Sequence, residues 1–302
     1  MKKIALAKTL LLALLLLAVV GHQPINLATG QNPLDITIKL DGSIDPAGAP
    51  IQRDGNSYIL TSDAGGIQVY RSNILLDGNR HALSSTLAAT NVANVTIRNF
   101  IVTVSNSMDN ILLDNCSNIT IANNTISRSS AVGSTSLGID VWGGTSNVIT
   151  GNIIIDNVNG ISLESTTSNN RISSNDIIGN YRGLWIYGSQ NNVIYNNNFV
   201  NNTIQVFVGG STPGTSVVNT FDFDAKGNYW SNYNGTDNNH DGIGDTPYII
   251  DDVNRDNYPL MKPVVIPEFP SLAFPLLSLI ASMLAMVCWN KRNRKISRFR
   301  ED

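Results

Sequence analysis

The sequence predicts an all-β protein, a right-handed parallel β-helix solenoid with a cap at each end. One observation is a repeat marked by two asparagines five residues apart, which starts at intervals of 24, 29, 23 and 22 residues: Asn94/Asn99, Asn118/Asn123, Asn147/Asn152, Asn170/Asn175 and Asn192/Asn197. Another is a glycine that opens the strings GIDVW, GISLE and GLWIY at similar intervals, at Gly138, Gly160 and Gly183. A period in the twenties is typical of a solenoid whose repeats bury their apolar faces against each other.

The residues between the markers favour strands over helices. Val, Ile and Thr alternate with polar residues without helical spacing, so each coil should contain short strands. Asparagine tolerates the left-handed backbone of a coil corner, and stacked asparagines can hydrogen-bond amide to amide. We therefore expect Asn152 and Asn175 to lie at equivalent positions on adjacent coils. A leucine-rich horseshoe is the alternative, but its Leu-x-x-Leu-x-Leu signature is missing.

The repeats divide the central part of the chain into three segments. Residues 31–92 read as an N-terminal cap with the first strands, because short alternating runs are separated by Asp-Gly and Gly-Gly turns. Residues 93–208 are the regular coils, with an insertion loop at Ser127–Ser136. Residues 209–262 are aperiodic and aromatic, and we expect them to cover the last coil as a C-terminal cap with four aromatic side chains: Phe221, Phe223, Tyr229 and Trp230.

Both ends of the chain read as membrane-targeting segments. Residues 1–30 resemble a signal peptide with a basic leader and a short apolar run, and an uncleaved anchor is the alternative. Residues 263–271 form a Pro-rich stalk, residues 272–289 are an 18-residue apolar run long enough for a transmembrane helix, and residues 290–302 are a basic tail. The positive-inside rule leaves this tail in the cytoplasm and the rest on the extracellular face of the membrane. A nucleic-acid-binding arm is disfavoured because the tail directly follows the apolar run.

The charge distribution agrees with an exposed ectodomain. Residues 31–265 carry 11 Lys and Arg against 20 Asp and Glu, whereas both ends are basic. A net-acidic ectodomain argues against a nucleic-acid partner and favours cation binding or simple solubility. Cys116 is the single cysteine of this part, so no disulfide can form within it and β stacking must hold it together.

Several strings resemble those of two known classes of protein. The string GNYWSNYNGTDNNHDGIGDTPYII, followed by DNYPLM and preceded by Asn-rich coils, resembles the NosD-type family of secreted β-helix proteins between Leu34 and Met261, and the opening IQRDGNSYILT resembles its archaeal surface members. The family takes its name from an accessory factor in the maturation of copper-containing nitrous oxide reductase. The string Pro-Glu-Phe-Pro at Pro267 to Pro270 resembles a class of archaeal C-terminal sorting signals, which implies processing by a membrane transpeptidase.

The residues favour a calcium site over a copper site. The chain has only three histidines (His22, His81 and His240), and Met108 with Cys116 is the closest approach to a soft-ligand site, so the residues do not support copper. The string DNNHDGIGD matches the first nine positions of an EF-hand-type Ca²⁺ loop, with ligands expected from Asp237, Asn239, Asp241, Ile243 and Asp245 around Gly242. Position 12 departs from the pattern because it is Tyr248 instead of Glu, so Asp251 or Asp252 would have to supply that ligand. A metal-free turn is the alternative.

The strands opened by the glycine marker predict a candidate binding face. If Ile139 and Val141 and their equivalents point inward, one outer face carries an aromatic stripe of Trp142, Trp185, Tyr187 and Phe207, together with Gln205 and two acids, Asp140 and Glu164. Flat exposed rings suit the apolar faces of sugars. Asp140 and Glu164 are also the candidate catalytic pair of a polysaccharide hydrolase, but the sequence lacks the paired-Asp, Gly-His-Gly and Arg-x-Lys motifs of polygalacturonases and a lyase-type Arg cluster.

The sequence thus favours binding over catalysis. We expect a cell-surface-anchored protein for carbohydrate recognition or surface-layer structure, whose partners are a polysaccharide or surface glycan, the membrane and surface-layer proteins. The alternatives are a polysaccharide hydrolase or lyase and a NosD-like accessory factor in copper enzyme maturation. Among the N-x-Ser/Thr triplets, Asn234 is the expected glycosylation site because it lies in the cap rather than in the repeat.

Overall fold

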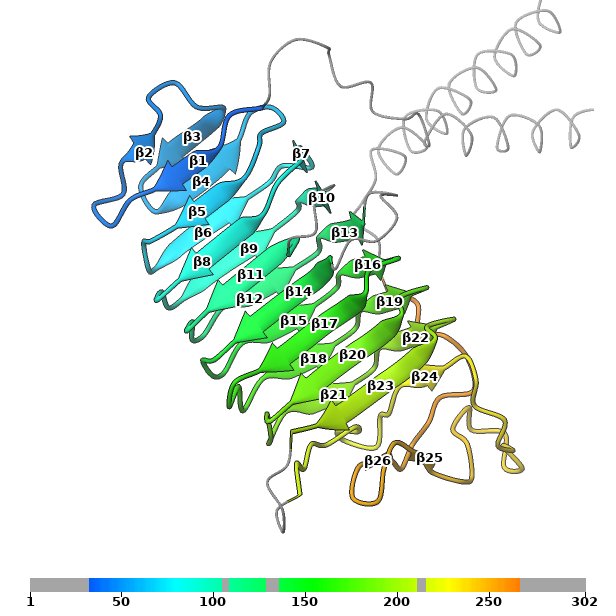
Figure 1. The fold of residues 1–302 in the computed structure, drawn as a ribbon. Helices are drawn as coiled ribbons and strands as arrows, with labels where there is room; N and C mark the ends of the chain where they lie inside the picture. Colours follow the sequence, from blue (N-terminus) through cyan, green and yellow to red (C-terminus); the bar gives the residue numbers. More distant parts are fainter. Residues whose placement is uncertain (1–32, 105–108, 129–135, 211–215, 267–302) are drawn as a thin grey trace, which may run out of the picture. The chain divides into compact units, whose positions relative to one another are not determined.

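The computed structural model describes residues 33–104, 109–128, 136–210 and 216–266, which wind as a right-handed parallel β-helix (Figure 1). The described residues contain no α-helix, and thus no helix able to cross a membrane. The signal peptide expected at residues 1–30, the apolar run at 272–289 and the basic tail lie outside the described residues, as does most of the insertion expected at Ser127–Ser136.

Three sheets run along the solenoid, and each coil contributes one strand to each sheet (Figure 1). The first sheet contains, in spatial order, β2 (Ile44–Asp45), β1 (Ile36–Ile38), β5 (Ile67–Val69), β8 (Leu87–Thr90), β11 (Ile111–Asp114), β14 (Leu137–Trp142), β17 (Asn159–Glu164), β20 (Arg182–Tyr187) and β23 (Ile204–Gly209). The second contains β21 (Val193–Tyr195), β18 (Arg171–Ser173), β15 (Val148–Thr150), β12 (Thr120–Ala122), β9 (Val95–Arg98), β6 (Ile74–Asp77), β4 (Ser57–Leu60) and β3 (Ile51–Asp54). The third contains β24 (Tyr229–Trp230), β22 (Asn198–Val200), β19 (Asp176–Ile178), β16 (Ile153–Ile155), β13 (Thr125–Arg128), β10 (Ile101–Val104) and β7 (Ala82–Leu83).

Neighbouring strands within these sheets are parallel except at the N-terminal edge, where β2 and β3 pair antiparallel with β1 and β4. Short antiparallel strands at the end of a solenoid keep its edge from pairing with another chain. At the other end, β25 (Tyr248–Ile249) and β26 (Arg255–Asp256) form a separate antiparallel pair beyond the last coil.

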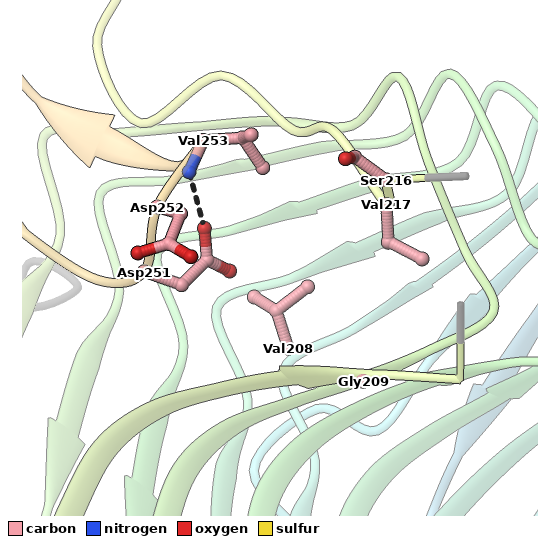
Figure 2. A pocket seen from close by; sticks show the side chains of 7 residues that line it. All are labelled: Val208, Gly209, Ser216, Val217, Asp251, Asp252 and Val253. Carbon is pink, nitrogen blue, oxygen red and sulfur yellow. Dashed lines mark hydrogen bonds between the residues drawn. The ribbon is translucent and has the colours of Figure 1, made fainter. Parts of the chain in front are cut away.

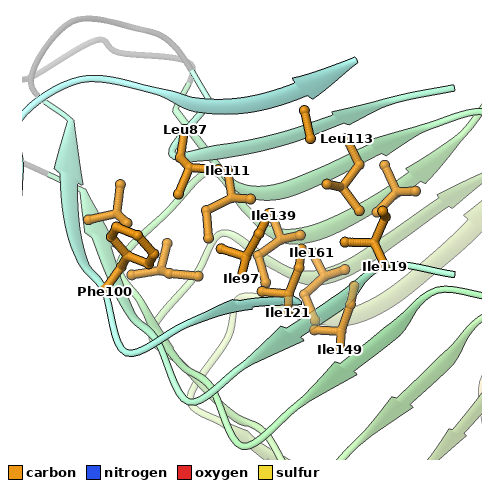
Figure 3. Close-up of a cluster of buried hydrophobic side chains, with 14 of the residues drawn as sticks. Leu87, Ile97, Phe100, Ile111, Leu113, Ile119, Ile121, Ile139, Ile149 and Ile161 are labelled. Carbon is orange, nitrogen blue, oxygen red and sulfur yellow. The ribbon is translucent and has the colours of Figure 1, made fainter. Parts of the chain in front are cut away.

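Aliphatic rows fill the interior because the register stacks like on like. Ile111, Ile139 and Ile161 lie above one another on the first sheet, and Ile97, Ile121 and Ile149 do so on the second (Figure 3). All six are fully buried. Each such side chain contributes roughly 1.5–3 kcal/mol through burial, so the inward alternation read from the sequence supplies the core.

Asparagines occupy two different positions in the coil, which corrects the expectation of five equivalent pairs. Asn118 and Asn123 have φ near +60° and lie on coil corners. The register aligns them with Ser146 and Gly151, not with Asn147 and Asn152. The first two asparagine pairs are therefore one residue out of phase with the last three, because the earlier coils have asparagine at the left-handed corner and the later coils have it at the next, inward position.

The inward asparagines form three buried ladders. In each, a side-chain oxygen accepts hydrogen bonds from the asparagine of the preceding coil, and Asn152 Nδ2 donates to Asn175 Oδ1 at 3.0 Å, which confirms the expected stacking. One ladder contains Asn147, Asn170, Asn192 and Asn219, and ends at Asn254. A second contains Asn124, Asn152, Asn175, Asn197 and Asn228, and ends at Asp256. The third contains Asn110, Asn157, Asn180 and Asn202, and ends at Gln205.

The glycine marker has a steric cause. A Cβ atom on Gly160 would lie 2.6 Å from the carbonyl oxygen of Gly183 and 3.1 Å from Asn180 Nδ2. Gly138 is equally constrained, since its Cβ would lie 2.3 Å from the Gly160 carbonyl oxygen. The repeated glycine thus lets the coils approach closely beside the third ladder.

The C-terminal cap is only partly as expected. Phe221 and Trp230 are buried, and the Trp230 ring stacks between Phe199 and Tyr248 at centroid distances of 4.5 and 4.3 Å. Phe223 instead remains 56% exposed and contacts Tyr195 on the outer side of the second sheet. The expectation that Phe223 covers the last coil is therefore wrong, because a turn closed by the Phe223–Lys226 bridge places the ring against Tyr195.

Candidate functional site

The outer face of the first sheet carries the candidate site, on β14, β17, β20 and β23. The register aligns Asp140, Ser162, Trp185 and Phe207 in one row. A second row aligns Trp142, Glu164 and Tyr187. The alternating residues between these rows, such as Val141 and Leu163, are fully buried. Strand alternation therefore turns both rows away from the core.

Gln205 does not belong to this face. It is buried at the start of β23, and its Oε1 accepts from Asn202 Nδ2 at 2.9 Å. It aligns with Gly183, where the strand begins at a corner. The expectation that Gln205 extends the outer stripe is wrong for this reason.

Three of the four predicted aromatic rings form one stack. Trp185 is parallel to Phe207 within 9° at a centroid distance of 4.3 Å, and to Tyr187 within 3° at 5.9 Å. Tyr187 and Trp142 are each 49% exposed, while Trp185 and Phe207 are half-buried. The rings of Trp185, Tyr187 and Phe207 are thus nearly parallel and come from two consecutive coils. Trp142 lies outside this stack, in the row of Glu164 and Tyr187.

Arg182 completes the stack, and the sequence pattern did not indicate it. Its guanidinium lies 4.6 Å from the centroid of the Trp185 ring and 4.8 Å from that of Tyr181, within range of cation–π attraction. Its Nη1 donates to Asn159 Oδ1 at 3.3 Å, while its buried Nε has no hydrogen-bond partner. The single signal in the sequence is position, because Arg182 opens the strand that carries GLWIY.

Three carboxyl groups lie beside the rings. Asp140 is 5% exposed and its Oδ1 has no hydrogen-bond partner. Burial, reinforced by the nearby carboxyls of Asp109 and Glu164, raises the pKa of Asp140 to about 7. Burial also raises the pKa of Asp109, with Glu164 adding to the shift. Asp109 was missed because it precedes β11 outside any repeated string.

Glu164 links the acids to the aromatic stack. Burial raises the pKa of Glu164, and a hydrogen bond from Trp185 partly opposes this shift. A carboxyl that is neutral near pH 7 can donate a hydrogen bond as well as accept one. The face therefore combines near-parallel aromatic rings, a guanidinium and carboxyl groups whose pKa is raised by burial.

A family model described as the periplasmic copper-binding protein NosD matches residues 36–235. The chain belongs to the NosD family. A "probable ABC transporter binding protein NosD" from Stutzerimonas stutzeri is 39% identical over 89 residues, which are 29% of this chain and 18% of that protein. The chain thus matches less than a fifth of that relative's length. A periplasmic family agrees with an extracellular location.

Copper, which the description of the NosD family names, does not fit the described residues. They contain no group of three His, Cys, Asp or Glu side chains placed to hold a metal ion. Nδ1 of His81 lies 3.5 Å from Oδ1 of Asp63. Cys116 is buried, its Sγ faces backbone carbonyls of Ala89 and Asp114, and burial raises its pKa. A buried thiol held protonated is a poor copper ligand.

The expected calcium loop of this NosD-family chain has part of the required geometry. Both carboxylate oxygens of Asp237 accept from the backbone, from Asp241 N at 3.1 Å and Gly242 N at 3.0 Å, and Gly242 has φ +87° as the sharp turn requires. Asn239 Oδ1 also accepts from Asp241 N. Asp245 is turned toward Asn238, whose N and Nδ2 donate to it at 2.9 and 2.7 Å. Calcium binding here stays a prediction.

A separate hollow lies between the end of β23 and the cap (Figure 2). Its volume is about 190 Å³, and Val208, Val217 and Val253 form its apolar side. Asp251 faces it, but this carboxylate already accepts from Val253 N, Asn254 N and Asn254 Nδ2. The hollow is thus a packing feature of the cap. Asn234 is exposed in the cap, where its glycosylation stays a prediction.

Proposed function

We propose that this NosD-family protein binds a polysaccharide or surface glycan across the outer face of its first sheet. The observation that supports this most is the near-parallel stack of Trp185, Tyr187 and Phe207. Exposed aromatic side chains in a contiguous row mark an interaction surface, and a sugar ring has an apolar face of C–H groups that packs on a flat ring. A fold that needed only solubility would carry Thr or Ser at these positions.

The polar groups around the stack would orient the sugar. Glu164 would hydrogen-bond hydroxyl groups, and Arg182, held beside Trp185, would donate to ring or hydroxyl oxygens. The stripe crosses four strands, which is about 14 Å at the spacing of a β-sheet. A few sugar units can lie along such a length. Recognition of hydroxyl groups requires no bond cleavage.

Catalysis by Asp140 and Glu164 is less well supported. The two acids lie on adjacent strands, and a raised pKa is what a general acid needs. However, a general acid must reach the glycosidic oxygen, and only 5% of Asp140 is exposed. Incubation of the purified protein with reducing-end-labelled polysaccharides tests this alternative, because a hydrolase or lyase shortens them and a binding protein leaves them intact.

The binding proposal is tested on a glycan array and on insoluble cell-wall polysaccharides with the purified full-length protein. We expect retention of wild type and reduced retention of Trp185→Ala. A matched control is Tyr258→Ala, because Tyr258 is an exposed aromatic side chain of the C-terminal cap, outside the strands that carry the stripe. Equal retention of the wild type and both variants would show that the aromatic stack does not contribute to glycan binding.

Membership of the NosD family favours a second candidate, an accessory role in the maturation of a copper enzyme. A gene deletion separates the two functions. Loss of copper from a periplasmic or secreted oxidoreductase, restored by the wild-type gene, supports the accessory role. If Trp185→Ala restores copper loading as well as wild type, the two functions use different surfaces.

We also propose that the β-helix is held at the outer face of the membrane by residues 272–289, where it serves recognition or surface-layer structure. The basic residues that follow this apolar run support this orientation. Protease added to intact cells should digest the β-helix and leave the tail protected. Labelling of the tail by antibody on intact cells would contradict this topology.

A further inference from the structure

A second hollow lies on the outer side of the second sheet, away from the stripe on the first sheet. Its volume is about 230 Å³. Arg171 on β18 and Val193 on β21 are directly paired neighbours in its floor. The corner residues Asn169 and Asn191 border it, and Tyr195 with Phe223 forms its aromatic side. Strands, corners and the C-terminal cap therefore converge on one concave surface.

The aromatic side of this hollow is built by the cap. The rings of Tyr195 and Phe223 lie 5.4 Å apart at 44° to each other, so they form two walls rather than one flat surface. Phe223 and Lys226 exchange backbone hydrogen bonds of 2.9 and 3.1 Å, which fixes the turn that carries the ring. A large apolar ring held 56% exposed in this way is available to a ligand.

The polar groups of the hollow are unused within the described part of the chain. Arg171 is exposed, and among the residues that the structure describes it forms no ion pair and no side-chain hydrogen bond. Asn169 and Asn191 have φ of 57° and 61°, so they lie on corners, outside the buried ladder that their neighbours Asn170 and Asn192 form. Their exposed carboxamides make no hydrogen bond to described residues, and neither does the hydroxyl of Tyr195.

These groups match one class of ligand. A guanidinium pairs with a carboxylate through two parallel hydrogen bonds. Two free carboxamides and a phenol hydroxyl can each donate to and accept from hydroxyl groups, and an aromatic wall packs on C–H groups. A volume below the range of drug-sized pockets limits the ligand to a single ring. We propose that this hollow binds a carboxylate-bearing sugar unit, such as a uronic acid residue.

Among the described residues, no carboxylate forms an ion pair with Arg171. Asp222, next to Phe223 in the chain, accepts from Asn257 N and Nδ2 at 2.9 and 2.8 Å, and is thus engaged within the cap. The hollow and the first-sheet stripe share no residue, so the failure of one proposal leaves the other intact.

The test compares methyl glucuronide and methyl galacturonide with the neutral methyl glucoside, by saturation-transfer NMR on the full-length protein. We expect binding of at least one uronide, a decrease of about tenfold or more in Arg171→Gln, as loss of a charge-assisted pair implies, and a loss on Phe223→Ala. Arg255→Gln, an exposed arginine of β26, is the matched control and should bind as wild type does.

Trp185→Ala should leave uronide binding unchanged, which separates this site from the stripe. Circular dichroism of each variant shows that the fold is retained, and Arg171→Lys, which keeps the charge without the planar fork, should recover only part of the affinity. Equal binding of glucoside and uronides, absence of binding to both uronides, or an unaffected Arg171→Gln would overturn the proposal. Stronger binding of inorganic phosphate than of either uronide would overturn it as well.

Discussion

Asn152 donates from Nδ2 to Oδ1 of Asn175 at 3.0 Å, and both amides are fully buried. The same Oδ1 accepts from the backbone N of Asn152, and Asn175 in turn donates from N and Nδ2 to Asn197 Oδ1. Each side chain therefore satisfies a backbone group at a corner where the sheet hydrogen bonds end. A buried polar group is costly unless all of its hydrogen bonds are made, so the ladder fixes the register of the coils.

Asn175→Leu should lower the free energy of unfolding by about 1–3 kcal/mol, because the N and Nδ2 of Asn152 lose their acceptor and the carbonyl of Ile149 loses its donor in the interior. Chemical denaturation measures the loss. Gln190→Leu is the control, since Gln190 is exposed beside the same coil. A loss below a few tenths of a kcal/mol for Asn175→Leu would contradict the structural role of the ladder.

Substitution by glycine should be tolerated at a corner asparagine and should destabilise the fold at a ladder asparagine. Asn118→Gly should change stability by less than about 0.5 kcal/mol, because glycine adopts the left-handed corner without strain. Asn147→Gly should cost about 1–3 kcal/mol, since the carbonyl of Cys116 and the backbone N of Ile119 lose their partner. Equal changes in the free energy of unfolding would show that corner and ladder asparagines contribute equally to stability, which would contradict this distinction.

Stability should fall as pH rises between about 4 and 7. Burial raises the pKa of Asp140 to about 7, and burial raises the pKa of Asp256 to about 6. In this range the folded protein keeps protons that the unfolded chain has released, so raising the pH favours unfolding. Thermal melts should show a higher Tm at pH 5 than at pH 8, and Asp140→Asn should flatten the profile. A Tm that rises across this range would contradict the burial of both carboxyls.

The loop from Asp237 to Asp245 should bind Ca²⁺, and added Ca²⁺ should raise the Tm because it binds the folded state. Asp237 and Asn239 already face the backbone turn in the required way, and Asp245 would rotate from Asn238 toward the ion. Asp241→Ala should remove the gain without unfolding the coils, whereas Asp224→Ala, at an exposed cap residue outside the loop, should keep it. A Tm that is the same with Ca²⁺ and with excess chelator would retire the site.

The repeat period and strand alternation suffice to predict the fold, but not the phase of the asparagines. Asn118 and Asn147 look alike in sequence because corner and ladder positions are adjacent and both favour asparagine, for backbone and for hydrogen-bonding reasons. The third ladder was missed although Asn157, Asn180 and Asn202 follow the same intervals. Each of them follows the second member of a pair by five residues, at Asn152/Asn157, Asn175/Asn180 and Asn197/Asn202, so the marker in these coils is a triplet and not a pair.

The parts of the candidate site that follow from strand alternation were predictable from the sequence. The parts that depend on contacts with residues outside the repeated strings were not. Trp185 and Phe207 lie in register as the period requires. The proximity of Asp109 to Asp140 is a tertiary effect, and so is the burial of Asp140, which the outward direction of its side chain did not suggest. Phe223 faces outward because the cap departs from the coil geometry, and no repeat predicts that.

The Trp185 stack is proposed to bind glycan. Calorimetric titration of the protein with the polysaccharide identified on the array measures this binding. Wild type should bind, and Trp185→Ala should bind about tenfold or more weakly, because removing one stacked ring costs on the order of 1–3 kcal/mol. The control Tyr258→Ala, in the C-terminal cap, should match wild type. An unchanged affinity of Trp185→Ala for that polysaccharide, with the fold intact, would contradict the account.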